Sequence, residues 1–424
     1  MFFLILNFVK KKMQATVEKW TKIVLINLSI VALLGVTLRY KIAFSLPFID
    51  QKNLLHGHSH FAFSGWITQA LMILLIFYLQ KNGRESSFKR YGWILSANLI
   101  ISYGMLVCFA VQGYAFFSIL FSTLSIFVSY IFATLFWKDL NKLKLNQNSH
   151  LWFKAALIFN VISSVGPFSL AYMMYSHEVN QKIYLASIYY FLHFQYNGWF
   201  LFACMGLFIY KIHQFFPGQK NFKTIFWIFT LSCIPSYFLS ALWLPIHKII
   251  YVLVVISAVM QMTGWIWFIK IIRDYFPVLK KELSSPAKWL FLLAAISMSI
   301  KLVLQLGSTL PSLSQLAFGF RPIIIGYLHL VLLGLFSLFI FGYIIAEKLL
   351  VTYKLTIAGL IVFVSGVFIN ELFLMLQGVM ALATKSIPYI NELLLFAAVI
   401  LFTGIALINI RQISSDMLPG KTMK

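Results

Sequence analysis

The sequence predicts an all-α, polytopic membrane protein, mainly because of its composition. Of the 424 residues, 61% are hydrophobic and only 11% are charged, whereas about a quarter of the residues of an ordinary soluble domain are charged. A transmembrane helix needs about 20 apolar residues, so the chain has room for roughly twelve spans and for no sizeable soluble domain. The function must therefore lie within the bilayer or at its surface.

Twelve apolar runs, each bounded by polar clusters, define the expected transmembrane helices. They cover residues 20–38, 53–79, 91–110, 115–136, 151–172, 184–210, 222–243, 248–269, 287–308, 322–345, 353–376 and 390–410.

The whole chain, residues 1–424, is expected to form one integral membrane domain. Its connecting loops are short and no period of 20 to 50 residues repeats, which argues against separate domains. Residues 1–19 should form a cytoplasmic or interfacial N-terminus, since an apolar stretch precedes three lysines, the reverse of the order in a signal peptide. Residues 20–410 should form the twelve-helix bundle and residues 411–424 a cytoplasmic tail.

The basic residues predict which side of the membrane each loop faces. When the loops are assigned alternately to two sides, the side with both termini holds 26 Lys and Arg and the other side holds 7, while Lys301 lies within a span. The positive-inside rule then makes the first side cytoplasmic. Both termini should be in the cytoplasm, and the expected location is a bacterial inner membrane.

The net charge of +23 follows from the same basic loops, so no nucleic-acid partner is expected and membrane lipid is the expected surrounding. The three cysteines, Cys108, Cys204 and Cys233, lie inside apolar segments without CxxC spacing. Neither a disulfide framework nor a zinc site is indicated.

Four of the expected spans carry histidine in their outer half. These are span 2 with His56, His58 and His60, span 6 with His193, span 7 with His247 at its end, and span 10 with His329. At 1.5 Å per residue, His60, His193 and His329 reach similar depths, roughly 10 to 15 Å below the outer surface. A lone intramembrane histidine is as often a hydrogen-bonding link between helices. Three at matching depth indicate a functional site, and neutral imidazole ligates heme and copper.

The residues around these histidines are rich in glycine and aromatic side chains. They include His60–Trp66, Tyr196–Trp199, Gly326 and Gly334. Small residues let helices approach closely and aromatic rings pack against a flat macrocycle, which favours a heme pocket.

In span number, span direction and histidine-bearing helices, the chain resembles subunit I of the heme-copper oxidase superfamily, which includes cytochrome oxidases and nitric oxide reductases. The segment Gly326–Gly334 looks like that family's helix X pattern. The resemblance implies that a low-spin, b-type heme has His329 as one axial ligand. The opposite ligand would be His56, His58 or His60, among which His60 best matches the depth of His329.

The resemblance also implies an incomplete second centre. His193 and His247 match two of the three copper ligands of the family, and Tyr327 stands where the family has the histidine of its oxygen-reactive heme. Copper binding and rapid oxygen reduction are therefore not expected, although the Tyr327 phenolate could ligate a heme. Arg321 and Arg39, at the outer ends of spans 10 and 1, would either pair with heme propionates or serve as interfacial anchors.

The expected function is that of a heme-binding membrane protein in electron transfer, or in the reduction or sensing of oxygen or nitric oxide. Whether it is an oxidoreductase stays open, and no catalytic residue is assigned. The alternatives are a secondary transporter without heme and a nitric-oxide stress-response membrane protein. Transporters often consist of two related halves, but Pro167, Pro235 and Pro322 do not correspond to one another. Because the loops are short, a partner subunit or a soluble electron donor would have to provide any large docking surface.

Overall fold

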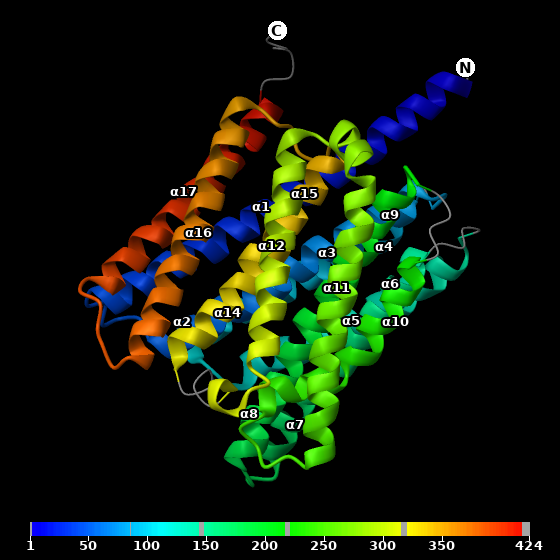
Figure 1. Ribbon diagram of the computed structural model, residues 1–424. Helices are drawn as coiled ribbons and strands as arrows, with labels where there is room; N and C mark the ends of the chain where they lie inside the picture. Colours follow the sequence, from blue (N-terminus) through cyan, green and yellow to red (C-terminus); the bar gives the residue numbers. More distant parts are fainter. Residues whose placement is uncertain (1, 85, 144–147, 217–220, 315–319, 418–424) are drawn as a thin grey trace. The chain divides into compact units, whose positions relative to one another are not determined.

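The computed structural model describes residues 2–84, 86–143, 148–216, 221–314 and 320–417 (Figure 1). These residues form helices joined by short turns, with no strand among them, so the expected all-α class is confirmed. Two parts of the predictions lie outside the described residues. One is the ends of the chain, Met1 and residues 418–424 of the expected tail. The other is a set of four basic residues used to orient the chain: Lys144, Lys220, Lys421 and Lys424.

Ten helical stretches among the described residues are long and apolar enough to cross a membrane, which makes the chain an integral, multi-pass membrane protein. Six of them are single helices: α1 (Phe2–Ala43), α4 (Ser87–Gln112), α5 (Phe116–Asn141), α11 (Lys248–Glu282), α16 (Lys354–Leu382) and α17 (Ile390–Met417). A seventh is α12 (Ser285–Gly307). The other three stretches are each made of consecutive helices. The first consists of α2 (Gln51–Phe61), η1 (Ala62–Thr68) and α3 (Gln69–Lys81), and the second of α6 (Asn148–Ser163) and α7 (Val165–Tyr175). The third consists of α14 (Arg321–His329), η4 (Leu330–Ser337) and α15 (Leu338–Ala346).

The two remaining expected spans fall on helices of a different character. One is α10 (Asn221–Cys233) followed by the 3-10 helix η3 (Pro235–Ala241), with a bend of 44° between them. The other is the continuous stretch α8 (Gln181–His193), η2 (Phe194–Phe200) and α9 (Leu201–His213). All of η2 and most of α9 are buried within the protein. A helix enclosed by protein can carry polar side chains, which explains why this stretch is less apolar than the other ten.

The chain divides into two compact units. Unit 1 consists of Met1–Phe132, Ile340–Gln377 and Ser386–Lys424, and unit 2 consists of Ala133–Phe339 and Gly378–Lys385. The three histidines of α2 belong to unit 1. The histidines that end α8 and α14, and His247 in the turn before α11, belong to unit 2.

In unit 1, α1 and α17 run antiparallel beside each other, so the described start of α1 and the described end of α17 lie at the same end of the unit (Figure 1). The amide of Asn409 on α17 links the two helices, because its Nδ2 donates to the Leu25 carbonyl at 2.9 Å and to Ser29 Oγ at 2.7 Å.

Residues that the sequence assigns to the cytoplasmic side also meet at one end of unit 1. Lys81 Nζ at the end of α3 pairs with Glu347 Oε2 after α15 at 2.5 Å. The guanidinium of Arg411 on α17 lies 3.8 Å from the ring centre of Tyr353. These two contacts connect the end of α3, the loop between α15 and α16, and the last turns of α17. All three segments are predicted to be cytoplasmic, so their meeting at one end of the unit agrees with spans of alternating direction.

Glycines allow α16 and α17 to approach closely. A Cβ at Gly404 would overlap the backbone nitrogen of Phe363, and a Cβ at Gly366 would lie 2.8 Å from the backbone nitrogen of Leu401. Without a hydrophobic effect between helices in lipid, such close van der Waals packing is a main source of helix association.

Gly404→Ala should therefore lower the free energy of unfolding by about 1–3 kcal/mol, the usual cost of overpacking. Thermal unfolding in detergent measures the change. Gly92 is a matched control, because it also lies inside a helix but a Cβ there would have no atom within 4 Å. Gly92→Ala should leave stability equal or raise it by up to about 1 kcal/mol; equal effects of the two substitutions would contradict the packing argument.

Candidate functional site

Each of the three histidines expected at matching depth is followed by a π-helix. η1 begins two residues after His60, η2 begins directly after His193, and η4 begins directly after His329. π-helices are rare and frequently lie at functional sites. The same rare element beside three histidines on three separate spans marks these segments as a related set.

A glycine stands five residues after each of these histidines, within the π-helix: Gly65, Gly198 and Gly334. Glycine fills only 22 of 424 positions, so three chance matches at one spacing are improbable. Neighbouring side chains occupy the space that a Cβ would need. A Cβ at Gly65 would lie 2.7 Å from the Phe61 ring, and one at Gly198 would lie 2.5 Å from the Cβ of Phe159. A Cβ at the third glycine would lie 2.8 Å from a serine hydroxyl of α12. From the sequence these glycines were expected to let helices approach, whereas their common spacing was not predicted.

Asparagines from neighbouring helices bind the backbone of η1. Asn27 Nδ2 of α1 donates to the Gly65 carbonyl at 2.6 Å, and its Oδ1 accepts from the Tyr103 hydroxyl at 2.9 Å. Asn98 Nδ2 of α4 donates to the Ser64 carbonyl at 3.1 Å. Both asparagines are buried. Because a bilayer offers no water to backbone groups in its interior, these amides are what make the irregular segment tolerable there.

The histidines of α2 lie on two different faces of the helix. His56 and His60, one turn apart, both face the end of α4. The His60 ring stacks on Phe109 at 4.2 Å, and the His56 ring meets the Tyr114 ring edge-on at 4.7 Å.

His58 faces α1 instead. A Cβ placed on Gly35 of α1 would meet the His58 Cε1 at 3.7 Å. The His58 ring therefore lies beside a glycine of α1, whereas the face of the His60 ring is covered by an aromatic side chain.

His193 in unit 2 uses both ring nitrogens. Its Nε2 lies 2.8 Å from the Cys233 carbonyl, and its Nδ1 lies 3.0 Å from Asn197 Nδ2. A carbonyl can only accept, so Nε2 carries the proton and Nδ1 accepts from the amide. Cys233 ends α10 just before Pro235, and Ser236 Oγ donates to the same carbonyl at 2.9 Å. His193 thus caps the carbonyl exposed where this span bends.

His247, the second expected copper ligand, lies at the exposed start of α11. It is the N-cap residue, and its Nδ1 accepts from the Ile249 backbone N–H at 3.3 Å. Within the described ranges, no group of three His, Cys, Asp or Glu side chains lies close enough together to hold a metal ion.

His329 lies within α14–η4–α15, and its Nδ1 is 2.8 Å from the Ile325 carbonyl. This contact makes Nδ1 the protonated nitrogen, so a neutral ring has its lone pair on Nε2. Metal-bound histidines commonly donate their other ring N–H to a carbonyl in this way. Tyr327, two residues earlier, lies edge-on to Tyr196 of η2 with ring centres 6.2 Å apart.

Four other charged residues in or beside the spans have separate surroundings. Arg321 is exposed at the start of α14. In unit 1, Arg39 interacts electrostatically with Glu371, which accepts a hydrogen bond from Asn370 Nδ2 at 3.1 Å. In unit 2, the buried Lys301 Nζ donates to Gln305 Oε1 at 2.8 Å.

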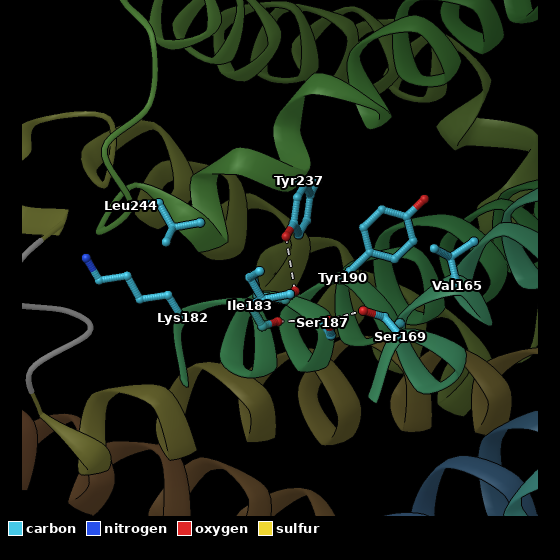
Figure 2. A pocket seen from close by; sticks show the side chains of 10 residues that line it. Val165, Ser169, Lys182, Ile183, Ser187, Tyr190, Tyr237 and Leu244 are labelled. Carbon is cyan, nitrogen blue, oxygen red and sulfur yellow. Dashed lines mark hydrogen bonds between the residues drawn. The ribbon is translucent and has the colours of Figure 1, made fainter. Parts of the chain in front are cut away.

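A largely apolar groove of about 220 Å³ lies on unit 2 between α7, α8 and η3 (Figure 2). In its wall, the Tyr237 hydroxyl donates to the Ala186 carbonyl at 3.0 Å and Ser187 Oγ donates to Ser169 Oγ at 3.0 Å. The Tyr237 ring centre is 6.0 Å from that of His193. The groove therefore lies one aromatic ring away from the buried histidine.

No protein-family model matches the sequence, and no curated protein is significantly similar to it. The functional assignment therefore depends on the chemistry of the side chains described above.

The hydrogen bonds to η1 can be tested by substitution. Asn27→Leu would remove the partners of the Gly65 carbonyl and the Tyr103 hydroxyl, and should lower the free energy of unfolding by about 1–3 kcal/mol. Thr37→Val on the same helix is the control, because Thr37 Oγ1 only donates to the Leu33 carbonyl at an exposed position; its effect should stay within about 0.5 kcal/mol. An Asn27→Leu protein as stable as the control would show that these bonds do not support η1.

Proposed function

We propose that this protein binds a low-spin, b-type heme within the bilayer and acts in electron transfer, or in the reduction or sensing of oxygen or nitric oxide. His329 and one histidine of α2 would hold the heme iron. The observation that carries this proposal is the repeated unit of an intramembrane histidine, a π-helix and a glycine five residues after the histidine. Buried ionisable residues and π-helices each favour a functional site over simple packing.

His329 has the surroundings that a heme ligand needs. Its Nδ1 donates to the Ile325 carbonyl, which fixes the ring so that Nε2 is the nitrogen that would ligate iron. When bound, the heme would supply a one-electron carrier or a gas-binding iron. The two histidines would hold the iron, and the surrounding residues would orient the heme and keep water away from it.

Among the histidines of α2, we favour His58. It faces Gly35, a residue without a side chain, whereas the His60 ring is stacked on Phe109. His60 is the second choice, because its depth best matches that of His329 and it begins the repeated unit. His56 is the third.

Copper is the weaker part of the resemblance. Both nitrogens of His193 already have hydrogen-bond partners, so copper would have to displace either the Cys233 carbonyl or Asn197. Tyr327 replaces an imidazole at the second heme position, so we expect slow or no oxygen reduction.

In this proposal all twelve helical stretches cross the membrane, both termini are cytoplasmic, and the protein resides in a bacterial inner membrane. The contacts between Lys81, Glu347, Arg411 and Tyr353 at one end of unit 1 support the alternation on which the orientation depends. A partner subunit or a soluble donor would deliver the electrons.

Secondary transport is a second candidate, favoured by the bend between α10 and η3. Broken helices at membrane depth often line the binding sites of transporters, and the groove beside Tyr237 lies at this bend. A transporter needs no heme, so the colour of the purified protein separates the two candidates.

The detergent-purified protein should show the sharp reduced absorption bands of a low-spin heme, and His329→Ala should abolish them. Of the three α2 variants, His58→Ala should have the same effect. His213→Ala, which changes a histidine at the end of α9, is the control and should keep the full spectrum. A colourless wild-type protein would contradict heme binding, and an unchanged spectrum in His329→Ala would contradict the ligand assignment.

A further inference from the structure

His56 and His60 present two imidazoles on the same face of α2. They lie four residues apart, a spacing that brings side chains together on one side of a helix and that many metal-binding helices use. Both rings contact the same pair of aromatic residues: Phe109 lies 6.2 Å from His56 and 4.2 Å from His60, and Tyr114 lies 4.7 Å and 6.3 Å away, measured between ring centres.

The turn between α4 and α5 holds Tyr114 over these histidines. Gly113 ends α4 with φ +64, a conformation that favours glycine, and a Cβ there would overlap the Asn53 amide of α2. The buried Ser118 Oγ donates to the Gly113 carbonyl at 2.6 Å and accepts from the Ala115 N–H at 2.9 Å. Tyr114 is therefore presented to α2 by a closely fitted turn.

The polar atoms of this cluster lack good mutual hydrogen bonds. His60 Nε2 lies 3.4 Å from the Tyr114 hydroxyl, near the limit for a hydrogen bond. His56 Nε2 is buried and has no hydrogen-bond partner. A buried polar nitrogen without a partner costs about 1–3 kcal/mol, and a ligand bound at His56 Nε2 would recover this free energy.

We propose that His56, His60 and Tyr114 form a binding site for a divalent transition-metal ion of the zinc class, separate from the heme. Two imidazole nitrogens and a phenol oxygen suit Zn²⁺ and Cu²⁺ better than Mg²⁺ or Ca²⁺. Tyr114 is 46% exposed, which gives the ion access from outside and leaves room for water as a further ligand. With two strong protein ligands the site is open and exchangeable, unlike a closed structural zinc site.

The site goes beyond the heme proposal, and the two can fail independently. It uses the α2 face opposite to His58, so the heme and the ion need no common ligand. Zn²⁺ is also spectroscopically silent, so heme absorption can be followed while zinc binding is measured.

Zinc chloride titrated into the full-length, detergent-purified protein, followed by calorimetry, tests the proposal. The wild-type protein should bind one ion at this site, and His56→Ala and His60→Ala should each weaken its affinity by at least about tenfold, as the loss of supporting groups at metal sites does. Tyr114→Phe should weaken it less. The control His177→Ala removes an exposed histidine of unit 2 and should leave the affinity unchanged. Size-exclusion profiles and thermal unfolding verify that each variant is folded.

Two results would overturn the site. One is an unchanged zinc affinity in the folded His56→Ala and His60→Ala proteins. The other is loss of the heme spectrum in His60→Ala but not in His58→Ala, since His60 would then belong to the heme. Absence of heme from the wild-type protein, together with zinc binding that depends on His56 and His60, would remove the heme proposal and support this one.

Discussion

The absence of water from the bilayer interior is the constraint on which the rest of the structure depends. Every irregular backbone segment and every polar side chain in a span needs a partner from the protein. The π-helix η1 is tolerated because Asn27 and Asn98 bind its carbonyls. The bend at Pro235 is tolerated because His193 and Ser236 bind the Cys233 carbonyl. In both places a polar residue that could be taken for a catalytic group performs a structural task.

This constraint also separates the three histidines of the repeated unit. His193 binds the backbone at a bend through its Nε2, whereas His329 binds the Ile325 carbonyl of its own helix through its Nδ1, as metal-bound histidines commonly do. The same local structure therefore surrounds histidines with different partners. In the proposed function, these partners distinguish the histidine that holds the backbone together from the one that would bind iron.

The positions of the ten spans found among the described residues were predictable from the sequence, because the apolar runs are long and the loops are short. The stretch from α8 to α9 was included for the same reason, although Gln195 and Asn197 make it less apolar than a lipid-facing helix; only the structure shows that it is buried. The π-helices were not predicted, since hydropathy does not distinguish them from α-helices, but the spacing of histidine and glycine was present in the sequence. The partners of His193 could not be predicted, because the Cys233 carbonyl is forty residues away along the chain and becomes available only through the bend. Depth along the helix favoured His60 as the heme ligand of α2. Depth does not reveal which neighbour each histidine of α2 faces, because this depends on how α1 and α4 pack against α2.

The most direct test of the central claim is low-temperature electron paramagnetic resonance of the oxidised, purified protein. A heme held by two histidines gives the signal of low-spin ferric iron with two imidazole ligands. The account predicts this signal in the wild-type protein and its loss, with folding retained, in His329→Ala. A protein that contains no iron, or one whose only heme signal is high-spin, would contradict it.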